Sequence, residues 1–93
     1  MNQHGDDKRL IQMLKRSLEL NDELLRLAHD RPDLWPPIVR QRTGLLQALE
    51  DLQNGLAPDP KLRVVLERVA KQLEDTVLRA HRLQEAQHPK VNA

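Results

Sequence analysis

The sequence predicts an all-α protein, folded as an antiparallel up-down-up three-helix bundle with long first and third helices. The chain of 93 residues contains eighteen leucines, three glycines and a single aromatic residue, Trp35. Leucine is a strong helix former, whereas sheets favour aromatic and β-branched side chains. The apolar residues recur at helical spacing in three stretches that proline-containing segments separate. We expect residues 1–93 to form a single helical domain.

The first helix is expected over residues 6–29, and Asp6 or Asp7 can cap its N-terminus. Its apolar residues form two interleaved heptad series that cover about 200° of the helix surface, whereas a helix with one packing partner needs a stripe of ~100°. The surplus lies on the face with Met13, Leu20 and Leu27. We expect this face to support self-association in a possible homodimer.

The second helix is expected over residues 35–53, after the segment "RPDLWPP". Proline is excluded from a helix interior but suits the first turn, where the missing N–H has no partner. Trp35 then stands at the helix entrance, and we expect its ring to fold back over the first turn near Val39, as in a hydrophobic staple.

The third helix is expected over residues 60–87, with a frayed tail over 88–93. The Asn-Gly pair at 54–55 suits a left-handed C-terminal cap of the preceding helix. Asp59 and Pro60 suit the N-cap and first turn of the third helix. The expected inner series of this helix is Leu62, Leu66, Val69, Leu73, Ala80 and Leu83.

The charge pattern excludes several classes of protein. Lys and Arg total 15, Asp and Glu total 14, and the two signs are interspersed. A nucleic-acid partner is not expected, since such proteins usually carry a concentrated basic stripe. The chain has no cysteine, no apolar signal segment and no run near the ~18 apolar residues that membrane insertion requires. We expect a cytoplasmic protein.

Catalysis and metal binding are not expected either. The hydroxyl residues are Ser17, Thr43 and Thr76, and Ser17 and Thr76 occupy heptad positions that face the core. A hydroxyl there usually bonds a carbonyl of the preceding turn. The histidines His81 and His88 are seven apart, not the three or four that brings two metal ligands together. We therefore predict no metal, no cofactor and no enzymatic activity.

Two polar residues, Asn21 and Arg42, interrupt the apolar stripes. One interpretation is an anion-binding interior, as in small all-helical chorismate mutases, but such a site needs several inward cations and only Arg42 is a candidate. The favoured interpretation gives Asn21 a role in helix register and lays the Arg42 stem over the core edge with its head in water. The chorismate-mutase-like enzyme is the less favoured alternative.

The segment "LLRLAHDRPDLWPPIVRQRTGLLQALEDL" is similar to the flagellar export chaperones of the FliT family. In that family a leucine-rich first helix ends in a short acidic turn, a Trp opens the second helix, and an Arg and paired leucines follow. A third long amphipathic helix completes the likeness, which covers residues 10–86. The matching residues are Leu24, Leu25, Ala28, Asp33, Trp35, Arg42, Leu45 and Leu46.

This resemblance implies a cytoplasmic type III export chaperone. Such a protein binds the C-terminal helical segment of the filament-cap protein, prevents its premature assembly and brings it to the export ATPase complex. In the family the cargo lies against the second and third helices, and Trp35 would shape one end of that groove. The matching partner-binding positions are Trp35, Val39, Arg42, Leu46, Val65, Val69 and Gln72.

The chain departs from longer relatives, which have a fourth helix that covers the groove and in some bacteria inhibit the flagellar master transcription regulator. No such helix follows residue 87 here, so these regulatory roles are not expected. An accessory chaperone of an injectisome-type secretion system is the alternative, and only the cargo would distinguish the two.

Overall fold

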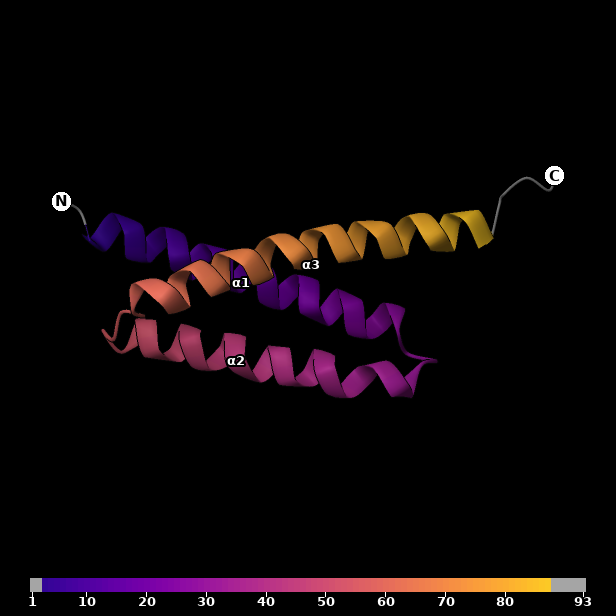
Figure 1. The fold of residues 1–93 in the computed structure, drawn as a ribbon, viewed down its shortest axis with the longest axis horizontal. Coiled ribbons are helices and arrows are strands. Elements are labelled where there is room, and N and C mark those ends of the chain that lie inside the picture. The colour runs from indigo at the N-terminus through magenta and orange to yellow at the C-terminus, as the bar shows by residue number, and fades with distance from the viewer. Residues whose placement is uncertain (1–2, 88–93) are drawn as a thin grey trace.

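The computed structural model describes residues 3–87, with side chains described for residues 7–86. It contains α1 (Gln3–Leu27), a short 3-10 turn η1 (Pro32–Leu34), α2 (Trp35–Gln53) and α3 (Pro60–Gln87) (Figure 1). No strand occurs among the described residues, so the prediction of an all-helical protein with three helices is confirmed. The expected tail over 88–93 lies outside the described residues.

The bounds of α2 and α3 agree with the prediction, whereas α1 differs at both ends. It begins at Gln3, so Asp6 and Asp7 lie within its first turns and not at its cap. It ends at Leu27, two residues earlier than expected. Pro32 disfavours helical geometry in Arg31, which has φ of −125° and ψ of 73°, so the helix cannot continue through this residue into η1.

Both predicted caps between α2 and α3 are present. Gly55 has φ of 84°, the left-handed conformation, and its N–H donates to the Leu52 carbonyl at 3.0 Å. At the start of α3, Asp59 Oδ1 accepts a hydrogen bond from the Leu62 N–H at 2.8 Å, and Pro60 occupies the first turn. Local sequence signals therefore fix both ends of this connection.

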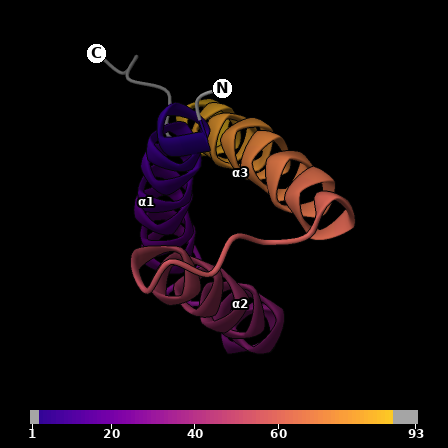
Figure 2. The ribbon, with the colours of Figure 1, turned by 90° about the vertical axis from the view of Figure 1, so that its left-hand side faces the viewer.

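Helix α1 is the central element of the fold. Helix α2 runs back along it, and α3 crosses it in the view of Figure 1. Both α2 and α3 pack against α1 but make almost no direct contact with each other. Figure 2 shows the two helices on different sides of α1, joined by the 54–59 connection across the open side. The three helices therefore form an open arrangement.

The core follows α1 and takes one buried stripe from each of the other helices. This explains the wide apolar surface of α1, which has two packing partners where α2 and α3 each have one. The buried cluster consists of Leu10, Leu14, Leu20, Leu45, Ala48, Leu52, Leu66, Leu73 and Val77.

The structure changes the interpretation of the α1 face assigned to self-association. Leu20 is buried and borders a hollow between α1 and α3, while Met13 and Leu27 are half-buried against the core. Packing within one chain therefore covers most of this face, because α3 crosses over it. Its exposure gives no support to a homodimer.

The two hydroxyl residues that were expected to face the core, Ser17 and Thr76, differ in burial. Ser17 is buried, but its Oγ has no hydrogen-bond partner, contrary to the expected bond to the preceding turn. Thr76 is exposed, so its predicted core position is wrong.

In the part of the chain that the structure describes, no helix combines the length and the apolar composition that crossing a membrane requires.

Candidate functional site

A hollow of about 340 Å³ lies between α2 and α3, where the two helices fail to pack against each other. Leu45 and Leu66 are buried there, while Leu62 and Val65 on α3 stay 43% and 47% exposed. Most of the wall is apolar, with polar groups only on α2. The lining residues are Gln41, Gly44, Leu45, Gln47, Ala48, Asp51, Leu62, Val65, Leu66 and Val69.

Gly44 lies in the α2 wall of this hollow. Glycine inside a helix costs about 1 kcal/mol relative to alanine. Nothing lies within 4 Å of the position that a Cβ of Gly44 would occupy, so packing within the chain does not require glycine here. The residue leaves the α2 backbone open toward the hollow.

The structure brings together only some of the predicted partner-binding residues. Val65 and Val69 line the hollow, and Gln72 lies on the same edge of α3, seven residues after Val65. Val39 and Leu46 are half-exposed on the other side of α2, where Leu46 borders a separate hollow formed by α2 alone. The predicted set is therefore divided between the α3 wall of the hollow and the outer side of α2.

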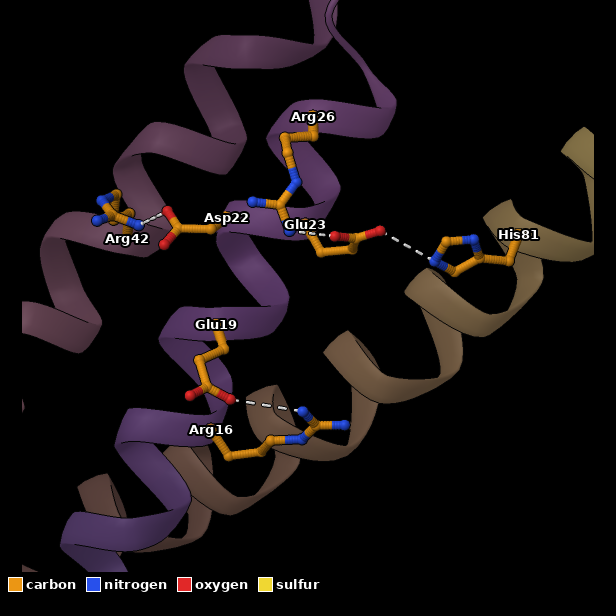
Figure 3. Close-up of polar contacts among 7 residues, drawn as sticks. All are labelled: Arg16, Glu19, Asp22, Glu23, Arg26, Arg42 and His81. Carbon is orange, nitrogen blue, oxygen red and sulfur yellow. Dashed lines mark hydrogen bonds and ion pairs between the residues drawn. The ribbon is translucent and has the colours of Figure 1, made fainter.

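The polar pair Asn21 and Arg42 joins α1 to α2. Asn21 is fully buried, and its Nδ2 donates at 3.0 Å to both the Ile38 carbonyl and Gln41 Oε1. Arg42 forms an ion pair with Asp22 (Figure 3), so its head bonds a carboxylate and is directed at α1. This pairing leaves no unpaired inward cation at Arg42 for a chorismate-mutase-like anion site.

Trp35 connects the end of α1 to the start of α2. Its Nε1–H donates to the Ala28 carbonyl at 2.6 Å, and the residue is 40% exposed. The last carbonyls of a helix lack intrahelical partners, and an indole N–H usually finds an acceptor when its ring is partly covered. Those two rules together could have identified this bond from the sequence, which suggested only a hydrophobic contact near Val39.

We predict that Trp35→Phe lowers the free energy of unfolding by about 1 kcal/mol and the thermal midpoint by about 5 °C, because the ring is kept while its donor is lost. Thermal unfolding followed by far-ultraviolet circular dichroism measures the change. Trp35→Ala, which removes the ring as well, should be more destabilising. If Trp35→Phe had the same thermal midpoint as the parent protein, the indole hydrogen bond would contribute nothing to the stability of the connection between α1 and α2.

A second polar cluster joins α1 to α3. The Glu23 carboxylate accepts a hydrogen bond from Arg26 and contacts His81 Nε2 at 3.1 Å (Figure 3). The Arg26 guanidinium, with a smaller contribution from His81, lowers the pKa of the Glu23 carboxyl below its ordinary value. The adjoining hollow of about 510 Å³ carries charges of both signs. The Glu23 carboxylate bonds Arg26 of α1 and His81 of α3, so this cluster joins the two helices.

Metal-binding chemistry has no cluster to support it in the described residues, where no group of three or more His, Cys, Asp or Glu could hold an ion. No protein family, curated protein or solved structure matches this chain.

Proposed function

We propose that this protein is a non-catalytic chaperone that binds an amphipathic helix of another protein in the hollow between α2 and α3. The observation that carries this proposal is the half-exposed pair Leu62 and Val65, which line a mostly apolar hollow opposite α2. A helix that entered the hollow would remove these side chains from water and would gain the hydrophobic free energy of their burial.

Gly44 supports the same proposal. A residue that weakens α2 and is not required by packing in the free chain is explained if another backbone approaches α2 closely there. Ala48, four residues further along α2, also lines the hollow with a small side chain. Small residues on one wall and larger apolar residues on the other suit a helix laid between them.

As cargo we propose the C-terminal helical segment of the flagellar filament-cap protein, carried in the cytoplasm to the export ATPase complex. The similarity of residues 24–52 to the FliT family supports this choice. With cargo bound, the up-down-up unit of α1, α2 and α3 would become a closed four-helix bundle. An injectisome-type cargo would occupy the same hollow, so a binding measurement with both peptides distinguishes the two systems.

Calorimetry with a peptide from the cap protein's C-terminus tests the proposal. We expect roughly micromolar affinity for the parent chain, because ordering costs offset much of the apolar burial. Val65→Asp should weaken binding at least about tenfold, since the complex would bury a charged group where the parent chain has an apolar side chain. Leu46→Asp is the matched control: Leu46 is 45% exposed against 47% for Val65, but it lies on the other side of α2.

The two variants also locate the site. If Leu46→Asp abolished binding and Val65→Asp did not, the cargo would lie on the outer face of α2 and the proposed groove would be wrong. If the parent chain bound an injectisome cargo helix but not the cap-protein peptide, the groove would stand and the flagellar assignment would fail. Circular dichroism of each variant verifies that it is folded.

A further inference from the structure

The α2 edge of the hollow carries one cation and one carboxylate. Arg40, Gly44, Gln47 and Asp51 follow one another at spacings of four, three and four, which places them on one stripe of the helix. Gly44, Gln47 and Asp51 line the hollow, and Arg40 is exposed one turn before them. Asp51 Oδ1 already accepts a hydrogen bond from Gln47 Nε2 at 3.0 Å.

The α3 edge carries cations only. Lys61, Val65, Arg68 and Gln72 form a stripe with the same spacings, and Val65 lines the hollow. Lys61 and Arg68 are exposed on either side of it. The two edges together therefore hold three cations and a single carboxylate.

These three cations differ from the cations around the hollow of about 510 Å³ between α1 and α3. Beside the α1–α3 hollow, Arg16 pairs with Glu19 and Arg26 pairs with Glu23. Arg40, Lys61 and Arg68 form no ion pair within the described residues. The apolar hollow between α2 and α3 is thus bordered by unpaired positive charge.

We propose that this groove selects a partner helix whose apolar stripe is bordered by carboxylates. The inference rests on the proposed function, since it names the charge of the helix that the groove binds. Carboxylates on such a helix would face Arg40 on one edge and Lys61 and Arg68 on the other. Charges at an interface rim chiefly set specificity and association rate, and a lysine-bordered helix would be repelled.

A second copy of the chain fits this groove poorly. Outside the hollow, the exposed large apolar residues of α3 are Val64, Leu78 and Leu83, and the last two lie closest together. Along the helix, Leu78 has Glu74 and Asp75 on one side and Arg82 on the other, so its border is of mixed charge and not acidic throughout. Charge complementarity therefore favours a different protein as the occupant.

Three fluorescent peptides of about 14 residues, or about 21 Å of helix, test the inference. They share one leucine stripe and differ only in its flanks, which are Glu, Gln or Lys. Fluorescence anisotropy at low ionic strength should give about tenfold tighter binding of the Glu peptide than of the Lys peptide, with the Gln peptide between them. The difference should shrink as added salt screens the exposed charges.

Arg68→Glu should reduce the preference for the Glu peptide by about threefold in 0.1 M salt, and by more at lower salt. Arg82→Glu is the matched control: it makes the same charge change on an exposed residue of α3, thirteen residues beyond Val69. That offset is about 20 Å along the helix, twice the screening length in 0.1 M salt. At that salt concentration the control should leave the preference unchanged.

The outcomes separate the two proposals. Equal binding of all three peptides, or a preference for Lys, would overturn the charge inference while the groove stood. Failure of every peptide to bind would overturn both. Sedimentation of the protein alone tests whether a second copy of the chain occupies the groove. A dimer that Val65→Asp dissociates would assign the groove to that second copy. This result would contradict the proposal of an acidic partner.

Discussion

Leu14→Ala is expected to lower the free energy of unfolding by about 3 kcal/mol. Leu14 is fully buried on the central helix and belongs to the core cluster that α2 and α3 complete. Removing its branched side chain forfeits its burial and leaves a cavity. Since α2 and α3 make almost no contact with each other, no second interface can compensate for a weakened α1.

The expected loss is large for a chain of this size. Small domains are commonly stable by about 5 kcal/mol, so the variant should melt roughly 15 °C lower than the parent protein. Urea unfolding followed by circular dichroism gives the free energy, and a thermal scan gives the midpoint. Leu83→Ala is the control, because the same substitution at a 59% exposed residue of α3 should change stability by less than about 0.5 kcal/mol.

Equal effects of the two substitutions would contradict the central position of α1. They would mean that Leu14 is no better packed than Leu83, which requires a different arrangement of the helices. A destabilisation near 3 kcal/mol at Leu14 alone would instead support α1 as the element on which both other helices depend.

The ends of α2 and α3 could be predicted because short-range chemistry determines them. Gly55 supplies the left-handed residue of a C-cap, and Asp59 with Pro60 forms an N-cap within four residues. Each signal acts on its own turn of the chain and is independent of how helices pack. The prediction was less successful at the start of α1, because the helix begins at Gln3 and includes the two candidate cap residues Asp6 and Asp7.

The direction in which each apolar residue points in the folded chain was harder to predict. Leu62 and Leu83 belong to the same periodic series as the buried Leu73, yet both stay exposed. Periodicity defines one stripe along α3 but does not say where α3 crosses α1. Residues near the crossing are buried, and residues toward either end of the helix are left in water.

The same limit explains the division of the predicted binding set. Leu45 and Leu46 are adjacent in the sequence and both apolar, and the resemblance to the FliT family implied a groove position for Leu46. The structure buries Leu45 beside α3 and leaves Leu46 on the outer side of α2. Which of two neighbouring stripes meets α3 depends on the position of α3, a long-range property that α2 does not encode by itself.

The buried polar residue was recognisable as an interruption of the α1 stripe, but its partners were not. Asn21 donates to the Ile38 carbonyl and to Gln41, both on α2, while its Oδ1 has no partner. Both N–H groups of the Asn21 side chain donate to acceptors on α2, so they fix how α1 lies against that helix. This supports the expected role of Asn21 in register and leads to a test by a nearly isosteric substitution.

Asn21→Asp is expected to cost about 4 kcal/mol at pH 7 and about 1 kcal/mol at pH 3. Burial raises the pKa of the introduced carboxyl above the ~3.9 that it has in the unfolded chain. The unfolded chain therefore ionises first as pH rises, and stability falls from about pH 4 until the folded carboxyl ionises too. A shift of about two pKa units accounts for about 2.7 kcal/mol of the difference.

The groups around Asn21 explain why the charged form is disfavoured. The Ile38 carbonyl can only accept hydrogen bonds, so an ionised carboxylate would face it without a proton between them. Gln41 can turn its amide to donate one bond, but Arg42 is already paired with Asp22. At pH 3 the protonated carboxyl replaces one of the two lost donors, which leaves the smaller residual cost.

Urea unfolding of variant and parent at both pH values measures the effect, and Gln12→Glu is the control. It makes the same amide-to-acid change on the same helix at an exposed residue, where the cost should stay below about 0.5 kcal/mol at both pH values. A defect of equal size at pH 3 and pH 7 would show that the new carboxyl reaches water. In that case the α1–α2 contact would be looser than a fully buried Asn21 requires, and the amide could not be what holds the two helices in register.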